Sequence, residues 1–140
     1  MSEAPTVAIP IPIALLDHKL TAVGSPFEIV ETDVRGAPTR VWKNAPPSLR
    51  AIVEASRQFA ARDYLIYEDE RVTYAEHYRQ VAALAHALTR RFGVRKGDRV
   101  ALAMRNYPEW PVVFWATVAI GAIIVPLNAW WTATELRYAL

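Results

Sequence analysis

The sequence contains no cysteine among its 140 residues. A chain without thiols forms no disulfide framework, no thiolate metal site and no cysteine nucleophile. Glycine is also scarce: the chain has five, and none belongs to a GxGxxG or Walker-type phosphate loop. The sequence therefore predicts neither a Rossmann dehydrogenase nor a glycine-built phosphate cradle. The absence of cysteine is compatible with a reduced, cytoplasmic location. Peripheral contact of the protein with a membrane is a separate expectation.

The charge of the chain is small and dispersed. Sixteen Lys and Arg residues face fourteen Asp and Glu residues, for a formal net charge of +2. No run of five or six basic residues forms a nucleic-acid footprint, so we expect no nucleic-acid partner. The acidic triplet 68–70 lacks further ligands at a spacing that would close a metal shell. His77 and His86 fall on opposite faces of a predicted helix, and we therefore predict no metal site.

Residues 110–134 carry no charge and are long enough to span a bilayer. Pro111, Gly121, Pro126 and Asn128 divide this stretch into pieces that are too short to span singly. We favour a buried helix followed by a buried strand, and a membrane span is the alternative.

The last third of the chain alternates between strand and helix patterns. Strands are predicted at 99–104 and 123–127, with a helix at 110–122 between them and another beginning at Thr132. Two strands joined by a crossover of helical length predict a right-handed parallel βαβ unit with both sheet faces buried. The fold class is therefore α/β.

The middle of the chain predicts two β-hairpins, each followed by a helix. The first hairpin has a loop of three to five residues around Gly36, and the second turns at the acidic triplet. Ser48 is the expected N-cap of the first helix, and Thr73 with Glu76 forms a capping box for the second. The predicted strands pair 27–31 with 39–42 and 64–67 with 71–74, and the predicted helices cover 48–60 and 74–92.

The domain organisation follows from a change in composition near residue 26. Residues 1–26 are proline-rich, and we expect them to be loosely ordered apart from a short helix at 13–20 that docks through its leucines. Residues 27–140 form the expected α/β unit.

Four blocks of this unit resemble a known family. They read YEDERVTYAE, GVRKGDRVALAMRNYPEW, GAIIVPLNAWWT and ELRYAL, in that order along the chain. Residues 27–140 are similar to the N-terminal region of adenylate-forming acyl-CoA synthetases of the AMP-binding superfamily, and to fatty-acyl-CoA synthetases in particular. The resemblance implies an incomplete part of the large N-terminal domain of a longer enzyme, whose remaining polypeptide would be the main partner of this region.

The resemblance also implies a reaction. Such enzymes use ATP and Mg²⁺ to convert a fatty acid to an acyl-adenylate, and coenzyme A then displaces AMP to give the thioester. Counterparts of the family's phosphate loop, its aromatic-Thr-Glu motif, its ribose-binding Asp and its C-terminal catalytic Lys are missing from these residues. We therefore expect no catalytic residue here, no cofactor bound by this piece and no activity from it alone.

The candidate site lies after the second strand of the βαβ unit, because ligands of open α/β sheets gather at the carboxyl ends of strands. Its residues are Leu127, Asn128, Ala129, Trp130 and Trp131. In acetyl-CoA synthetases the matching block lies beside the nucleotide part of coenzyme A, so the resemblance implies contact with CoA or the acyl chain. Burial of the two tryptophans in a core or between subdomains is the alternative that we favour.

Asn106 also follows a predicted strand. Because Pro108 and Glu109 come next, we interpret Asn106 as the N-cap of the helix at 110–122 rather than as a ligand.

The chain ends inside the helix predicted from Thr132, which the sequence Thr132-Ala133-Thr134-Glu135 opens as a capping box. We interpret this ending as truncation. It predicts exposed apolar surface around residues 110–131 and association into a homodimer or swapped oligomer. The alternative function, of a different class, is a non-catalytic module that binds acyl chains, a membrane face or a partner subunit.

Overall fold

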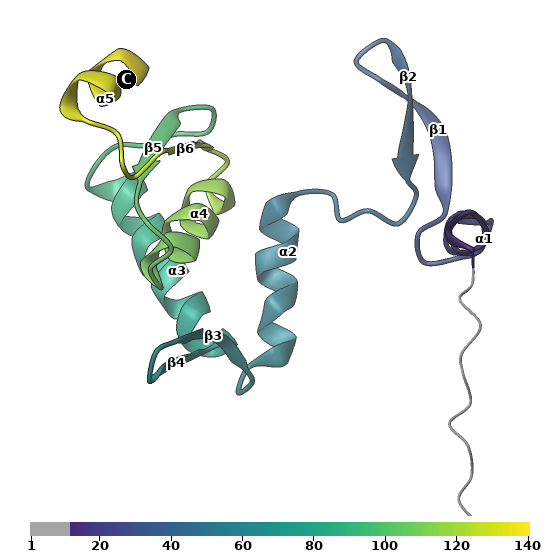
Figure 1. Ribbon diagram of the computed structural model, residues 1–140, viewed down its shortest axis with the longest axis horizontal. Coiled ribbons are helices and arrows are strands. Elements are labelled where there is room, and N and C mark those ends of the chain that lie inside the picture. Colours follow the sequence, from purple (N-terminus) through teal and green to yellow (C-terminus); the bar gives the residue numbers. More distant parts are fainter. Residues whose placement is uncertain (1–11) are drawn as a thin grey trace, which may run out of the picture. The chain divides into compact units, whose positions relative to one another are not determined.

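The computed structural model describes residues 12–140, and the chain forms two units that meet between Ala45 and Pro46. Figure 1 shows the order of the elements along the chain. The division that we expected after residue 26 stays a prediction, and residues 1–11 of the proline-rich segment lie outside the described residues.

The first unit contains a short helix and a hairpin: α1 (Ile13–Thr21), β1 (Ile29–Val34) and β2 (Ala37–Trp42). Arg35 and Gly36 make the turn with φ angles of 57° and 85°, and two successive positive φ angles are typical of a tight type I′ hairpin turn. The predicted loop of three to five residues is therefore wrong. Pro38 lies inside β2, opposite Asp33, which is tolerated because each strand of a two-stranded sheet is an edge.

The open end of this hairpin holds an ion pair. Lys43 Nζ lies 2.9 Å from Glu28 Oε1, and the Gly24 N–H donates to the second carboxylate oxygen at 2.8 Å. The leucines of α1, in contrast, bury little. Leu15, Leu16 and Leu20 are 46%, 39% and 47% exposed, so the predicted docking of α1 through its leucines is wrong within this unit.

The second unit begins with α2 (Leu49–Ala55), which continues as the 3₁₀ turn η1 (Ser56–Phe59). The Ser48 hydroxyl accepts from the Ala51 N–H at 3.2 Å, which confirms the predicted N-cap. The regular helix is shorter than expected. The Ser56 hydroxyl donates to the Val53 carbonyl at 2.6 Å, and such local bonds compete with the continuation of an α-helix.

The second hairpin joins β3 (Asp63–Tyr67) to β4 (Glu70–Thr73) through a turn at Glu68 and Asp69. The long helix α3 (Tyr74–Arg90) follows directly. Thr73 and Glu76 complete the predicted capping box: the Glu76 N–H donates to the Thr73 hydroxyl, and the Thr73 N–H donates to the Glu76 carboxylate. This box sets the point at which the chain changes from strand to helix.

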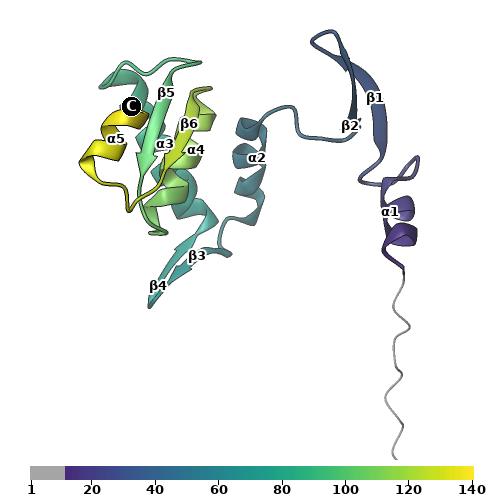
Figure 2. The same cartoon turned by 45° about the horizontal axis from the view of Figure 1, so that its top comes forward.

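The predicted βαβ unit is confirmed. It consists of β5 (Arg99–Ala103), α4 (Glu109–Ala119) and β6 (Ile123–Leu127), followed by α5 (Ala133–Ala139). The strands pair in parallel, with Arg99 opposite Ile123 and Ala103 opposite Leu127, and Figure 2 shows them side by side. Thr132 and Glu135 form the predicted capping box of α5. Together these elements confirm the α/β fold class.

The core of the second unit lies among its helices. Val53 of α2, Val81 of α3 and Ala116 of α4 are buried at its centre. The sheet is covered on one face: Leu102 is 5% exposed, whereas Ile123 is 48% exposed. In Figure 2 α3 and α4 lie behind the strand pair. The predicted burial of both sheet faces is therefore wrong for the described residues.

Candidate strand-end site

Two loops leave the β5–β6 pair at the same edge. Because Ala103 and Leu127 are paired at the ends of parallel strands, the residues that follow each strand come together there. They border a hollow of about 460 Å³ that we call the strand-end cleft. It is lined by Tyr67, Met104, Arg105, Asn106, Tyr107, Asn128, Ala129 and Trp130.

Arg105 and Trp130 contact each other across the cleft. The guanidinium carbon of Arg105 lies 4.5 Å from the centre of the Trp130 ring, which is cation–π distance. Trp130 is 73% exposed, so the indole is presented to solvent while the arginine holds it. The cleft therefore combines a positive charge with an accessible aromatic face.

Asn128 shapes the loop that carries Trp130. Its side-chain oxygen accepts from the Trp130 N–H at 3.0 Å, and its carbonyl accepts from the Trp131 N–H at 3.1 Å. The first bond has the sequence spacing of an Asx turn. Leu127 ends β6, and Trp131 is 37% exposed. Of the five predicted site residues, Asn128, Ala129 and Trp130 line the cleft, whereas Leu127 and Trp131 do not.

The exposure of Trp130 bears on one of the two kinds of burial that we favoured for the tryptophans, burial in a core, whereas burial between subdomains stays a prediction. Trp130 does not pack in a core of the described residues. Its loop follows the last strand of the sheet, and Arg105 alone stacks on it among the described cations.

Asn106 also differs from its prediction. The residue before the first turn of α4 is Pro108, and no side chain of residues 12–140 caps this helix. The Tyr107 N–H instead donates to the Arg105 carbonyl at 2.7 Å, and this tight turn separates Asn106 from the helix start. The capping interpretation is wrong, and Asn106 lines the cleft.

Sequence reasoning missed Arg105 and Tyr67. Arg105 follows a strand end, so the rule that selected residues 127–131 could have selected it too. Tyr67 comes from β3 in a different hairpin, and no local pattern indicates it. Its ring lies 6.1 Å from that of Tyr107 in an edge arrangement. Both tyrosines also line an adjoining hollow of about 290 Å³ with Leu65, Ile66 and Trp110.

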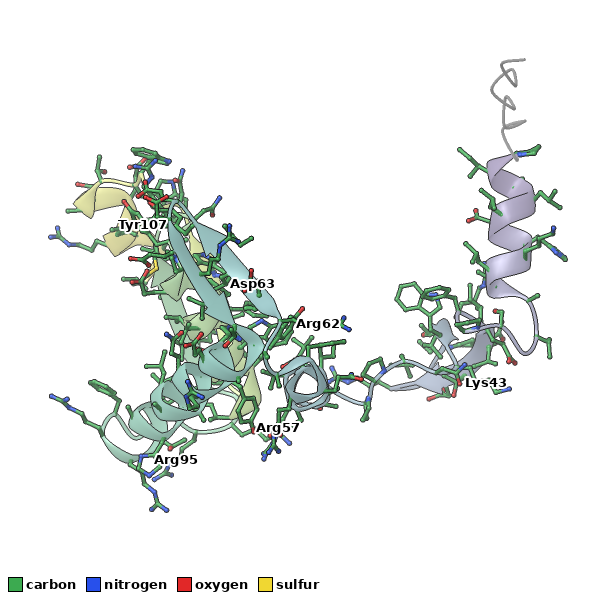
Figure 3. All side chains as sticks on the ribbon, turned by 90° about the horizontal axis from the view of Figure 1, so that it is seen from below. Lys43, Arg57, Arg62, Asp63, Arg95 and Tyr107 are labelled. Carbon is green, nitrogen blue, oxygen red and sulfur yellow. The ribbon has the colours of Figure 1, made fainter. Side chains whose placement is uncertain are left out.

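The opposite end of β5 is a turn without a ligand-binding cavity among the described residues. The Arg95 N–H donates to the Asp98 carboxylate at 2.8 Å, and Gly97 has a φ of 90°. Figure 3 shows Arg95 and Tyr107 at opposite ends of this unit. The cleft is thus at the carboxyl end of the strands, where ligands of parallel sheets bind.

Comparison with known proteins identifies the family. A family model described as AMP-binding enzyme matches residues 52–140. The chain belongs to this family. It is 30% identical over 103 residues to 4-hydroxybutyrate–CoA ligase 2 of Metallosphaera sedula, covering 74% of this chain and 19% of that protein. It is 36% identical over 94 residues to long-chain-fatty-acid–CoA ligase FadD13 of Mycobacterium tuberculosis, covering 67% and 16%.

A solved structure agrees with the fold. The N-terminal subdomain of Klebsiella oxytoca NpsA superimposes with a TM-score of 0.61 at 31% identity, covering 66% of this chain and 24% of that one. The chain thus spans less than a quarter of the length of each of these relatives.

Within residues 12–140, no three His, Asp or Glu side chains come together in a way that could hold a metal ion. No helix in the same range combines the length and apolar character needed to cross a membrane.

Proposed function

We propose that this chain is the N-terminal part of a fatty-acyl-CoA synthetase, which activates a fatty acid with ATP and transfers it to coenzyme A. Family membership supports the reaction class. The names of two relatives support the substrate: FadD13 and the Salmonella typhimurium protein, 30% identical over 115 residues, are both long-chain-fatty-acid–CoA ligases. Other polypeptide of the same enzyme is then the principal partner of this region.

The contact between Arg105 and Trp130 in the strand-end cleft is the observation that supports a ligand-binding role for this region. A guanidinium group suits a phosphate, and an exposed indole suits stacking on a purine base. Coenzyme A carries both groups and would supply the thiol that takes the acyl group. In this proposal Arg105 holds a phosphate of coenzyme A, Trp130 contacts its base, and Asn128 keeps the loop in place. The apolar hollow beside Tyr107 is open to the less polar part of the ligand.

The role of this region is binding rather than chemistry. Stabilising a phosphoryl or acyl-adenylate transition state takes a cradle of donors and a metal clamp. Neither occurs among the five glycines of the chain or the acidic groups of residues 12–140. ATP and Mg²⁺ would be held by other parts of the synthetase.

Two measurements test this function. The purified 140-residue chain is expected to give no ATP–pyrophosphate exchange with any fatty acid, whereas the complete synthetase gives it. Exchange by the 140-residue chain would contradict the assignment of chemistry to other parts.

The cleft is tested in the complete synthetase with Trp130→Ala and Asn128→Ala. Loss of one stacking contact weakens a bound base by about 1–3 kcal/mol, so Trp130→Ala is expected to raise the KM for coenzyme A with a smaller effect on the KM for ATP. Trp131→Ala is the matched control, because Trp131 does not line the cleft. If Trp130→Ala and Asn128→Ala both left the KM values for coenzyme A and the fatty acid unchanged, the cleft would have no substrate role.

A further inference from the structure

Positive charge gathers at one turn of the second unit. Residues 90–99, which run from the last residue of α3 to the first residue of β5, carry five basic side chains and one acidic side chain. The remainder of the chain carries eleven basic and thirteen acidic side chains. The positive net charge of the chain therefore comes from these ten residues alone. We call residues 90–99 the basic turn, and its cations are Arg90, Arg91, Arg95, Lys96 and Arg99.

The cations of the basic turn carry charge that the described residues do not compensate. All five side chains are exposed, and none of them belongs to an ion pair within residues 12–140. The one acidic residue of the turn, Asp98, accepts from the Arg95 N–H at 2.8 Å, so its carboxylate is engaged by the backbone. The turn therefore presents its positive charge to the solvent.

The backbone of the basic turn is held in place on both sides. The Val94 N–H donates to the Leu88 carbonyl at 2.9 Å, which ties the turn to the end of α3. The Gly97 N–H donates to the Gly121 carbonyl at 2.9 Å, which ties it to the loop before β6. The cations thus project from a fixed surface rather than from a flexible tail, at the end of the unit where Figure 3 shows Arg95.

Phe92 adds an apolar side chain to this basic surface. It lies beyond the end of α3 and is 65% exposed. The guanidinium carbon of Arg91 lies 5.5 Å from the centre of the Phe92 ring, which is cation–π distance. Basic side chains around an exposed aromatic ring are typical of surfaces that lie on anionic membranes, where the ring enters the boundary with the acyl chains.

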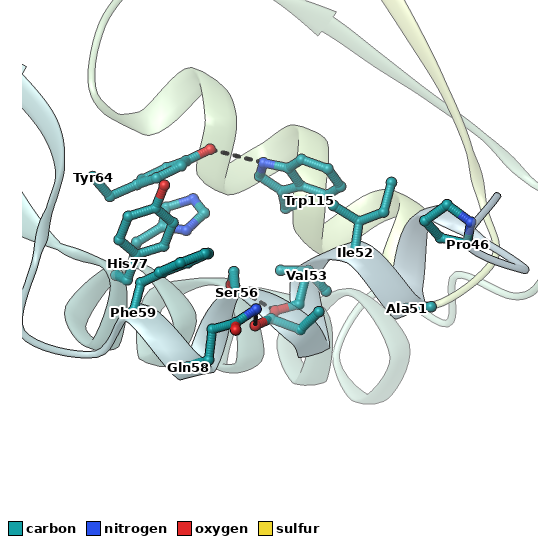
Figure 4. Close-up of a pocket in the computed structure, with 12 residues that line it drawn as sticks. Pro46, Ala51, Ile52, Val53, Ser56, Gln58, Phe59, Tyr64, His77 and Trp115 are labelled. Atoms are coloured by element: carbon teal, nitrogen blue, oxygen red, sulfur yellow. Dashed lines mark hydrogen bonds between the residues drawn. The ribbon is translucent and has the colours of Figure 1, made fainter. Parts of the chain in front are cut away.

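The hollows of the second unit lie away from the basic turn. Residues 90–99 do not line the strand-end cleft or the hollow beside Tyr107. Figure 4 draws a third hollow, of about 360 Å³, in which the Trp115 Nε1–H donates to the Tyr64 hydroxyl at 2.9 Å. None of the 12 residues that line it is Lys or Arg. The basic turn is therefore suited to an extended surface rather than to a small enclosed anion.

We propose that the basic turn docks the protein on an anionic membrane, with its cations on the lipid headgroups and the Phe92 ring at the boundary with the acyl chains. Each basic residue close to an anionic leaflet raises the affinity about fivefold, so five of them give reversible binding. An acidic protein or a nucleic acid would neutralise the cations, whereas a membrane also takes up the exposed ring. This surface is independent of the strand-end cleft and of the proposed function.

Co-sedimentation with lipid vesicles tests the proposal in the full-length protein. The vesicles consist of phosphatidylcholine alone or of phosphatidylcholine mixed with phosphatidylserine. We expect the protein to bind the phosphatidylserine vesicles at about 0.1 M salt, and to bind them more weakly at about 1 M salt, where charge is screened beyond about 3 Å. Absence of binding to the phosphatidylserine vesicles, or equal binding to both kinds of vesicle, would overturn the proposal.

Two double variants locate the surface. Arg91→Gln with Arg95→Gln removes two cations of the basic turn, so the affinity for phosphatidylserine vesicles is expected to fall about 25-fold. Arg79→Gln with Arg137→Gln is the matched control, because it lowers the net charge equally at exposed positions outside the turn. All four side chains are exposed, so both double variants should keep the fold. Equal losses of affinity in the two double variants would contradict a surface at the basic turn.

Phe92→Ser distinguishes a membrane from other anionic partners. Removal of the aromatic ring is expected to lower the affinity for phosphatidylserine vesicles about tenfold. Tyr138→Ser is the control, since Tyr138 is an aromatic residue that is 95% exposed outside the basic turn, and it should leave the affinity unchanged. If Phe92→Ser bound these vesicles as tightly as the parent protein, the surface would recognise charge alone, as for an acidic protein or a nucleic acid, and the membrane proposal would be wrong.

Discussion

The Arg105 guanidinium carbon lies 4.5 Å from the centre of the Trp130 ring, although 24 residues separate the two side chains along the chain. They meet because β5 and β6 are parallel and in register, with Ala103 opposite Leu127. Each residue stands a few positions beyond its strand end. The contact holds an exposed indole beside a positive charge at the edge of the sheet where ligands bind.

Replacement of this cation should weaken coenzyme A binding. A hydrogen bond to a charged group contributes about 1.5–3 kcal/mol, so Arg105→Gln is expected to reduce the affinity of the complete synthetase for coenzyme A by about tenfold or more, measured by calorimetry. Arg99→Gln is the matched control, because Arg99 is an exposed arginine at the other end of β5. Equal losses of affinity for coenzyme A in the two variants would indicate general electrostatic attraction to the basic residues rather than a binding site at Arg105.

The capping box of α3 should contribute measurably to stability. Thr73→Ala removes the hydroxyl that accepts from the Glu76 N–H, and loss of such a cap costs about 1 kcal/mol. The urea midpoint is therefore expected to fall. Thr132→Ala removes the same box from α5, a helix with no buried residue, so its effect on the main transition should be smaller. The reverse order would contradict the packing described for α3.

The buried imidazole should make stability depend on pH. Burial lowers the pKa of His77 below its ordinary 6.5, so the unfolded chain takes up a proton near pH 6.5 that the folded chain does not. Stability is then full above about pH 6.5 and falls on acidification, by at most about 1.4 kcal/mol per pH unit from this group. Urea unfolding at pH 7.5, 6.5 and 5.5 measures the slope.

His77→Phe should remove this dependence and His86→Phe should keep it. If the free energy of unfolding fell with pH equally in the parent chain and in His77→Phe, the loss of stability would come from groups other than His77.

The stability of the first unit should fall at a lower pH than the stability that depends on His77. The Gly24 N–H and then Lys43 hold the pKa of Glu28 below its ordinary 4.5. The ion pair therefore stabilises this unit above pH 4.5, and that stabilisation is lost as the pH falls through the lowered pKa. Carbon-13 NMR of the carboxyl group should give a midpoint below 4.5, which Lys43→Met moves upward. A midpoint that Lys43→Met leaves unchanged would contradict the pairing.

The uncovered sheet face should lead to self-association. Ile123 and Trp130 are exposed on the βαβ unit, and apolar surface of this kind is a site of association. Light scattering at rising concentration is expected to show a homodimer or a swapped oligomer, and Ile123→Lys should reduce it. A monomer at all concentrations, with no binding of an apolar dye, would contradict the prediction.

Local patterns accounted for most of the fold. The breakers around residues 110–128 separated α4 from β6, and the predicted bounds of β6 match those observed. The errors have physical causes. The loop of the first hairpin was predicted to be too long, because the predicted second strand began after Pro38. Proline is allowed on an edge strand, so the strand in fact includes Pro38. The capping of α4 by Asn106 failed because a tight turn at Arg105 intervenes.

The amino-acid sequence by itself determined the local elements, the parallel βαβ unit and the family, because capping boxes, breakers and apolar periodicity act over a few residues. Tertiary structure alone decided which distant side chains meet. The register of β5 with β6 brought Arg105 to Trp130. The packing of α3 with its neighbours buried His77, whose Nε2 atom has no hydrogen-bond partner among the described residues. Such contacts depend on strand register and helix packing over tens of residues, and no local pattern contains them.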